Sequence, residues 1–133
     1  MNFYLSEDVG KFIVRLMVSV LILFHGIGKV LHPQAISGIK RMLAANGLPE
    51  ILAFGAYFGE VVGPIMILLG VFSRIGGALV VIHMLFAIGL AHMADIFALT
   101  DSGVWAIESQ MFFLLSALAV MFLGSGRFAL RED

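Results

Sequence analysis

The sequence predicts an all-α integral membrane protein: a four-helix bundle with a short interfacial helix between the first and second spans. The first observation is the composition: the chain is 61% hydrophobic and only 13% charged. Soluble globular chains have about 45–50% apolar and about 25% charged residues. A domain of 133 residues cannot bury that much apolar surface in its own interior, since small domains leave much of their chain exposed. The other observation is that the apolar residues gather in four long stretches.

Each of these stretches has about the length of a membrane span. A spanning helix needs about 20 mainly apolar residues, and the stretches cover 9–31, 51–72, 75–94 and 106–123. Backbone groups find no water in the hydrocarbon layer, so each segment must satisfy its own hydrogen bonds as a helix. The first stretch lacks a small-residue cleavage site, and we expect it to be retained. We therefore expect 1–133 to form a single transmembrane domain.

The connection between the first two spans is amphipathic. Pro33 can open a short helix, and Ile36, Ile39 and Leu43 recur at helical spacing. Asn46-Gly47 then ends the pattern. This segment is predicted to be a short helix lying in the membrane interface.

The distribution of basic residues predicts the orientation. With four spans, both termini lie on one side, together with a tight turn around Ser73 and Arg74. Five basic residues fall on that side: Lys11, Arg15, Arg74, Arg127 and Arg131. The other side has Lys40 and Arg41, and Lys29 lies near the boundary. By the positive-inside rule, we expect a multi-pass protein of the bacterial cytoplasmic (inner) membrane with both termini cytoplasmic.

Composition also excludes several kinds of chemistry. The net charge of −1 offers no electrostatic footprint for nucleic acid. Cysteine is absent, which excludes thiol relays and Cys-ligated iron–sulfur clusters, and no metal-binding repeat is visible. Any redox role must therefore use a bound cofactor or quinone, or belong to a partner subunit.

The first span carries ionisable residues that need explaining, because a charge near the bilayer centre costs about 2.5–3.5 kcal/mol. His25 and Lys29 are four residues apart and share a helix face, with Arg15 further along the same stripe. Two structural interpretations stay open: Lys29 can snorkel to the interface, and His25 can be a hydrogen-bonded packing residue.

Glu60 lies near the middle of the second span, where it cannot easily reach water. Pro64 has no N–H to donate to the Glu60 carbonyl oxygen, so we expect a kink with spare acceptors beside the carboxyl group. A structural ion pair with Lys29, or a neutral Glu60, is the alternative. Glycines at four-residue spacing permit close helix packing on this span: Gly55, Gly59 and Gly63.

The third and fourth spans add further candidates. His83 and His92 are nine residues apart, so on a helix they point to nearly opposite sides and should not face one site. His92 lies towards the outer side with Asp95 near it, and Glu108 begins the fourth span; packing and surface exposure are their structural alternatives. Counting residues from the span ends predicts that five groups converge between mid-membrane and the outer face: His25, Lys29, Glu60, His92 and Glu108.

Several motifs occur in a recognisable order along the chain: Arg15-Leu16, Phe24-His25-Gly26-Ile27-Gly28-Lys29, Gly47-Leu48-Pro49, Glu60, Leu69-Gly70 with Arg74, and Glu108. Together, over 9–126, they resemble the DoxX family. The resemblance implies a four-helix membrane protein that acts as a subunit of a membrane oxidoreductase system; relatives include the membrane part of thiosulfate:quinone oxidoreductase. Carried over by position, it implies a polar site made of Arg15, His25, Lys29, Glu60, Arg74 and Glu108.

The leading functional hypothesis is a membrane oxidoreductase component whose outer-side pocket binds a quinone or a small redox ligand. Glu60 or His25 would exchange protons and Lys29 would hold an oxygen, with the remaining candidates binding the ligand: Arg15, Glu108, His92 and Arg74. The expected partners are the lipid bilayer, a redox partner subunit and a second copy of the chain. Three alternatives remain: a non-catalytic scaffold or chaperone, a small proton-coupled transporter, and haem binding by His25 with a histidine of the third span.

Overall fold

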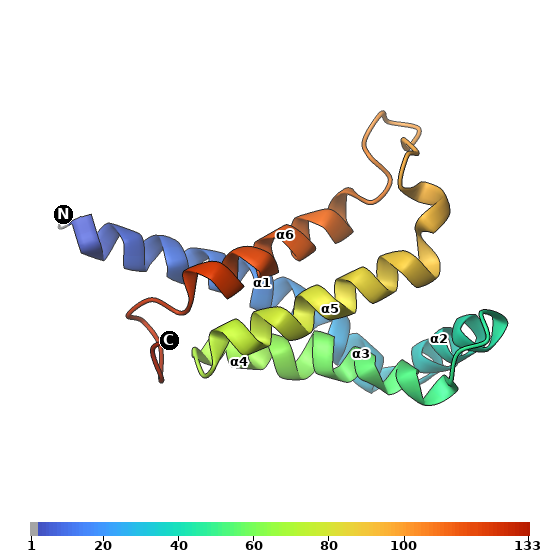
Figure 1. Ribbon diagram of the computed structural model, residues 1–133, viewed down its shortest axis with the longest axis horizontal. Helices are drawn as coiled ribbons and strands as arrows, with labels where there is room; N and C mark the ends of the chain where they lie inside the picture. The colour runs from blue at the N-terminus through green and yellow to red at the C-terminus, as the bar shows by residue number, and fades with distance from the viewer. Residues whose placement is uncertain (1–2) are drawn as a thin grey trace.

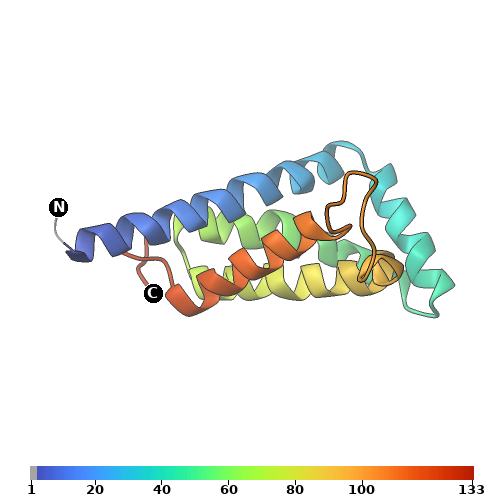
Figure 2. The same cartoon turned by 90° about the horizontal axis from the view of Figure 1, so that it is seen from above.

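The structure, a computed structural model, describes residues 3–133. Helical rods run side by side along its long axis (Figure 1). They are α1 (Phe3–Leu31), a segmented rod that ends in α4 (Gly63–Leu69), α5 (Ser73–Ala91) and α6 (Glu108–Leu123). The two ends of the chain lie at the same end of the bundle (Figures 1 and 2). The predicted all-α four-helix bundle is confirmed.

Three stretches of the described chain are helical, long and apolar enough to cross a membrane: Leu5–Leu31, Glu50–Leu69 and Ser73–Ala91. The fourth, α6, is apolar but has only 16 residues, about 24 Å at 1.5 Å per residue. It packs along α5 and α1. The bundle is therefore that of a multi-pass membrane protein with one short helix.

Helix α1 begins at Phe3, six residues before the predicted start. The predicted boundary followed hydropathy, which marks where the chain becomes apolar, whereas a helix can continue through charged residues such as Glu7 and Lys11. These residues lie in the first turns of α1, at the end of the bundle that carries the termini (Figure 1).

The second rod is segmented. It comprises η1, a 3-10 turn (Glu50–Phe54), α3 (Gly55–Tyr57), η2, a π-helical turn (Phe58–Val62), and α4. The predicted disturbance near Pro64 takes the form of this π-turn, which contains Glu60. Single π-turns inside helices are frequent at functional sites.

Helix α2 (Gln34–Ala45) lies across the end of the bundle opposite the termini (Figure 2). It buries Ile36 and Leu43 and ends at Asn46, as the sequence predicts. The Lys40 amine lies 4.7 Å from the centre of the Phe54 ring, which ties α2 to η1. The predicted short helix between the first two spans is confirmed.

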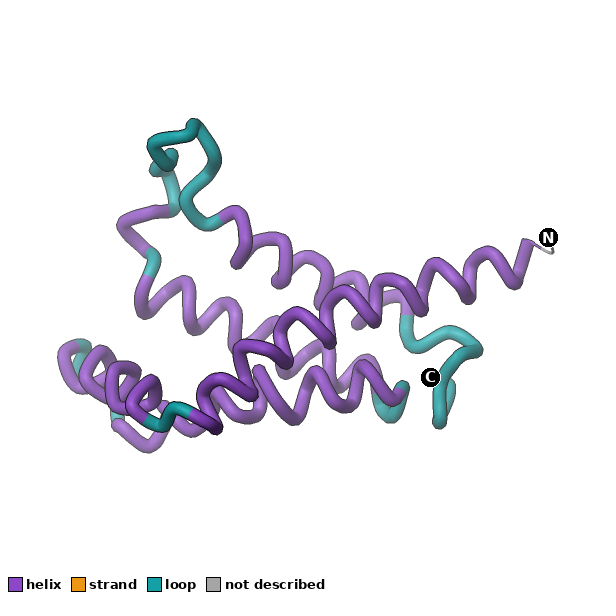
Figure 3. Tube along the Cα trace, turned by 180° about the vertical axis from the view of Figure 1, so that it is seen from behind, coloured by secondary structure: helices purple, strands orange, loops and turns teal. Residues whose placement is uncertain are grey.

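Loops gather at the two ends of the bundle (Figure 3). The turn between α4 and α5 lies at Gly70–Phe72, where Gly70 (φ 71°) and Phe72 (φ 49°) are both left-handed. Ser73 and Arg74, predicted to form this turn, are already in the first turn of α5. A C-terminal strap, defined as 124–133, folds back over the turn, and the Arg131 N–H donates to the Gly70 carbonyl at 2.9 Å.

Candidate functional site

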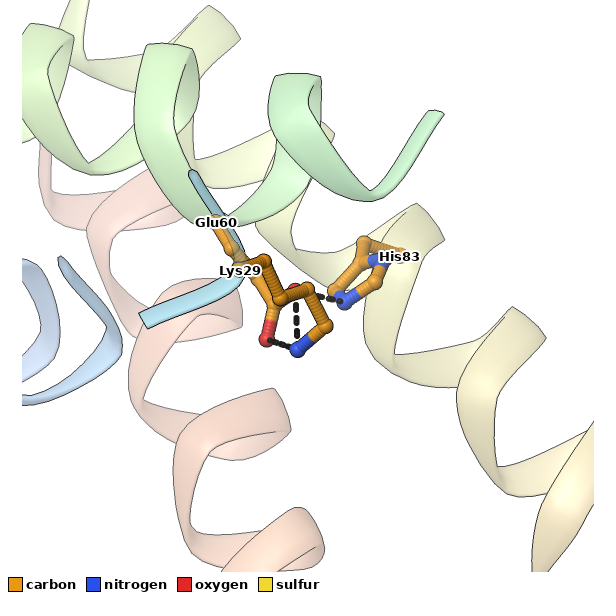
Figure 4. Close-up of polar contacts among 3 residues, drawn as sticks. All are labelled: Lys29, Glu60 and His83. Carbon is orange, nitrogen blue, oxygen red and sulfur yellow. Dashed lines mark hydrogen bonds and ion pairs between the residues drawn. The ribbon is translucent and has the colours of Figure 1, made fainter. Parts of the chain in front are cut away.

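Three side chains from three rods meet inside the bundle (Figure 4). Lys29 Nζ lies 2.9 Å from Glu60 Oε1 and 2.7 Å from Oε2. His83 Nε2 approaches the same carboxylate, 3.5 Å from Oε2. The side chains are 21%, 9% and 17% exposed for Lys29, Glu60 and His83. A charged pair in apolar surroundings is thus kept inside the bundle, with an imidazole beside it.

His83 is the member of this cluster that the sequence analysis missed. It lies on α5 and packs directly against Gly59. A Cβ added to Gly59 would lie 2.2 Å from the His83 Cβ. The sequence does contain an indication of this contact. Glu60 and His83 lie about equally far from the outer ends of their spans, which predicts that they lie at the same depth in the membrane. On its own helix, a single histidine such as His83 is typical of a packing residue; its partner is found only when the depths of the spans are compared.

The cluster lines a cavity of about 340 Å³, here called the head cavity. This volume lies within the range of about 300–1,000 Å³ typical of ligand sites. Its polar lining comes from α1, the π-turn, α5 and α6: His25, Lys29, Glu60, His83, His92, Ser109 and Gln110. A set of hydrogen-bonding groups therefore surrounds a space between apolar helices.

His92 lines the head cavity together with His83, and the prediction that they cannot face one site was wrong. The prediction assumed a continuous helix, whereas α5 ends at Ala91 and His92 leaves it with φ −128°. His92 Nδ1 then lies 3.4 Å from Asp95 Oδ2, and His92 Nε2 lies 3.4 Å from Gln110 Nε2. Through these two contacts His92 joins Asp95 to Gln110 of α6.

His25 also lines the head cavity, one turn before Lys29 on α1. Its ring packs edge-on against Phe113 of α6, with 6.1 Å between ring centres. The structure therefore places His25 beside the Lys29–Glu60 pair at the cavity wall.

Glu108 does not reach this cavity. It is exposed in the first turn of α6, where a carboxylate interacts favourably with the helix N-terminus. Gln110 and Ser109 line the cavity instead, because one residue turns a helix by about 100° and Glu108 falls on another face. Its predicted convergence with Glu60 was wrong.

Arg15 lies far from the cavity, since 14 residues separate it from Lys29 and span about 21 Å along the helix. Its side chain is 1% exposed, and the guanidinium donates to main-chain carbonyls of α4 and of the C-terminal strap: Ile67 (2.9 Å), Leu68 (3.1 Å), Ser125 (3.1 Å) and Phe128. The grouping of Arg15 with Lys29 and Glu60 in one polar site is corrected accordingly. Arg15 joins three parts of the fold near the termini.

Arg74 lies at that same end of the bundle. Its guanidinium donates to the carbonyls of Met121 (2.8 Å) and Phe122 (3.0 Å), and its backbone N–H donates to Asp133 Oδ2 (3.0 Å). It therefore closes the last turn of α6 and holds the strap. Like Arg15, it does not line the head cavity.

Comparison with known proteins gives the family. The DoxX family model matches residues 10–93, more than half of the chain. This protein belongs to the DoxX family. In this DoxX protein the matched region contains Lys29, Glu60, His83 and His92, and it ends before α6.

A curated relative of this DoxX protein is the "Putative oxidoreductase CatD" of Bacillus subtilis. The two are 25% identical over 83 residues, which are 62% of this chain and 60% of the relative. The chain thus spans about three fifths of the length of this curated relative. No solved structure matches the chain.

Proposed function

We propose that this DoxX protein is a membrane oxidoreductase component that binds a quinone, or a similar small redox ligand, in the head cavity. The observation that carries the proposal is the Lys29–Glu60–His83 cluster, which borders a cavity of about 340 Å³ between apolar helices. A further fact supports it: a relative that is 25% identical over 83 residues is named "Putative oxidoreductase CatD".

The proposed chemistry follows from the donors that surround the cavity. Reduction of a quinone to a quinol takes up two electrons and two protons; the electrons would come from a reduced cofactor of a partner subunit. Lys29 would donate a hydrogen bond to one quinone oxygen and stabilise the negative charge that develops there. Glu60 and His25 would exchange protons at the ring oxygens, with His83 beside Glu60. His92 would bind the outer side of the ligand.

The test is quinone binding to the purified protein in lipid nanodiscs. Lys29→Met and Glu60→Gln should each weaken binding by about 10–100-fold, the range for losing a hydrogen bond to a charged group. Lys40→Met is the matched control, since Lys40 lies over the Phe54 ring and lines no part of the head cavity. If the wild-type protein neither binds nor reduces any quinone, the proposal is wrong.

One observation favours a second candidate, a non-catalytic membrane scaffold. Glu60 is ion-paired through both oxygens to Lys29, which is how a purely structural pair inside a bundle would look. A charge swap, Lys29→Glu with Glu60→Lys, distinguishes the two. A scaffold would keep its partner with the swapped pair, whereas a quinone site would lose binding.

We also propose that the protein lies in the bacterial inner membrane with both termini cytoplasmic. The shared end of the two termini (Figure 1) carries five basic residues in the sequence, namely Lys11, Arg15, Arg74, Arg127 and Arg131. Two other basic residues, Lys40 and Arg41, lie on α2 at the opposite end. This bias is the one that the positive-inside rule associates with the cytoplasmic side.

A further inference from the structure

A second cavity adjoins the head cavity. Its volume is about 400 Å³, and it lies between the second rod and α5, under α2. The lining is almost entirely apolar, and its larger side chains are Leu52, Phe58, Leu79, Ile82, Phe86 and Leu90. Here it is called the tail cavity. Polar groups enter it only through the two histidines, His83 and His92.

The two cavities share part of their wall. Four residues line both of them: Ile39, His83, Ala87 and His92. Ala87 has the smallest side chain of the four, so it obstructs the junction least. A molecule held beside His83 in the head cavity therefore lies at the edge of the tail cavity as well.

The tail cavity also opens sideways from the bundle. Phe58, Ile82 and Phe86 line it and are 58%, 63% and 43% exposed. Large apolar side chains exposed on a spanning helix face lipid rather than water. The tail cavity thus connects the buried polar cluster with the hydrocarbon layer.

We propose that the tail cavity holds the apolar chain of a long-chain ligand whose polar head lies in the head cavity. The ligand class is a quinone with an alkyl or prenyl chain; this assignment rests on the function proposed above. A head enclosed by Lys29, Glu60 and His83 must let its chain leave between helices. Past Ala87 the chain would reach lipid along the apolar lining of the tail cavity.

The experiment compares two ligands in nanodiscs: a dimethoxy-methyl-benzoquinone without a chain, and the same head with a decyl chain. Ala91→Phe should fill the tail cavity, because Ala91 lines the tail cavity and not the head cavity. We expect it to weaken binding of the chained quinone by about tenfold or more, while the chain-free quinone binds as to the wild type. Leu85→Phe is the control, because Leu85 is 57% exposed on the same helix and lines neither cavity.

The outcomes separate the two proposals. If neither quinone binds the wild type, both proposals are wrong. If the chain-free quinone binds but Ala91→Phe leaves the affinity for the chained one unchanged, only the tail cavity assignment is wrong. Should Ala91→Phe not fold, Met42→Trp narrows the tail cavity at an exposed position of α2. A chain ending in a photoreactive diazirine should then label the α5 peptide containing Ile82 and Phe86; labelling confined to α6 overturns the assignment.

Discussion

The main-chain carbonyl oxygen of Glu60 lies directly against Gly26, such that a Cβ on Gly26 would be 2.0 Å from that oxygen. Pro64 cannot donate to this oxygen, and the π-turn presents the carbonyl to α1. The absence of a side chain at Gly26 lets the two rods approach closely. This approach lies three residues before Lys29 and brings its amine within reach of the Glu60 carboxylate.

Gly26→Ala should therefore separate α1 from the π-turn. Overpacking typically costs about 1–3 kcal/mol, and here the obstacle is backbone, which cannot rotate away. Quinone affinity should fall about as far as in Lys29→Met, measured by titration in nanodiscs together with thermal unfolding. Gly28→Ala is the control, because nothing lies within 4 Å of its Cβ; it should be neutral or slightly stabilising. Unchanged binding in Gly26→Ala would show that the close approach does not position Lys29.

Gly59→Ala should displace His83. The added Cβ would meet the His83 Cβ at 2.2 Å and the ring at 2.4 Å, so shortening the histidine to alanine would not relieve the contact, whereas His83→Gly would. We expect a loss of thermal stability in Gly59→Ala that is partly restored in Gly59→Ala/His83→Gly. Gly55→Ala has open space around its Cβ and serves as the control. A double variant no more stable than Gly59→Ala would contradict this packing.

Arg15→Lys should release the C-terminal strap. The guanidinium donates to the carbonyls of Ile67, Leu68, Ser125 and Phe128, and an ammonium group cannot reproduce that fork. Losing such hydrogen bonds to a charged group costs about 1.5–3 kcal/mol each. Hydrogen exchange at 124–133 should accelerate, while the head cavity keeps its ligand.

The control for Arg15 is Arg127→Ala. The Arg127 side chain is 70% exposed and only approaches Asp8, at 3.8 Å, so the change should alter stability by no more than about 0.5 kcal/mol. Equal exchange rates in the two variants would mean that Arg15 does not hold the strap.

Lys29 and Glu60 should be strongly coupled in stability. Removing one partner of a buried pair typically costs about 3–5 kcal/mol, because the other charge stays buried, whereas replacing both with apolar groups is often neutral. We expect Lys29→Met and Glu60→Met to lower the unfolding temperature in detergent individually, and the double variant to recover much of the loss. Strictly additive effects would argue against a direct pair.

Impermeant maleimide labelling of intact cells tests the orientation. The chain has no cysteine, so Ser102→Cys and Glu132→Cys each introduce a single reactive thiol. The loop between α5 and α6, which contains Ser102, lies at the opposite end of the bundle from the C-terminus, which is next to Glu132 (Figure 3). With cytoplasmic termini, only Ser102→Cys should react from outside. Labelling of Glu132→Cys alone would invert the orientation and leave the bundle unchanged.

Much of the candidate site could be predicted by counting depth along the spans. Lys29 and Glu60 carry opposite charges at matching depths, and a low-dielectric interior favours their pairing. The family resemblance grouped Arg15 and Arg74 with them, but a resemblance gives only the order of residues along the chain and not their depth in the membrane. Their guanidinium groups find carbonyls at the end of the bundle that holds the termini, where helices end and leave acceptors free.

The sequence by itself determined that the chain is a bundle of apolar helices with α2 across one end, because hydropathy alone decides which segments leave water for lipid. Only the tertiary structure decided which side chains share a cavity. Each interruption of the helical period changes the face that the following residues present: the π-turn rotates Glu60 relative to an ideal helix, and the end of α5 at Ala91 turns His92 back towards His83. Contacts between rods, such as Gly26 against Glu60 and Gly59 against His83, then bring these faces together, and no local pattern contains such contacts.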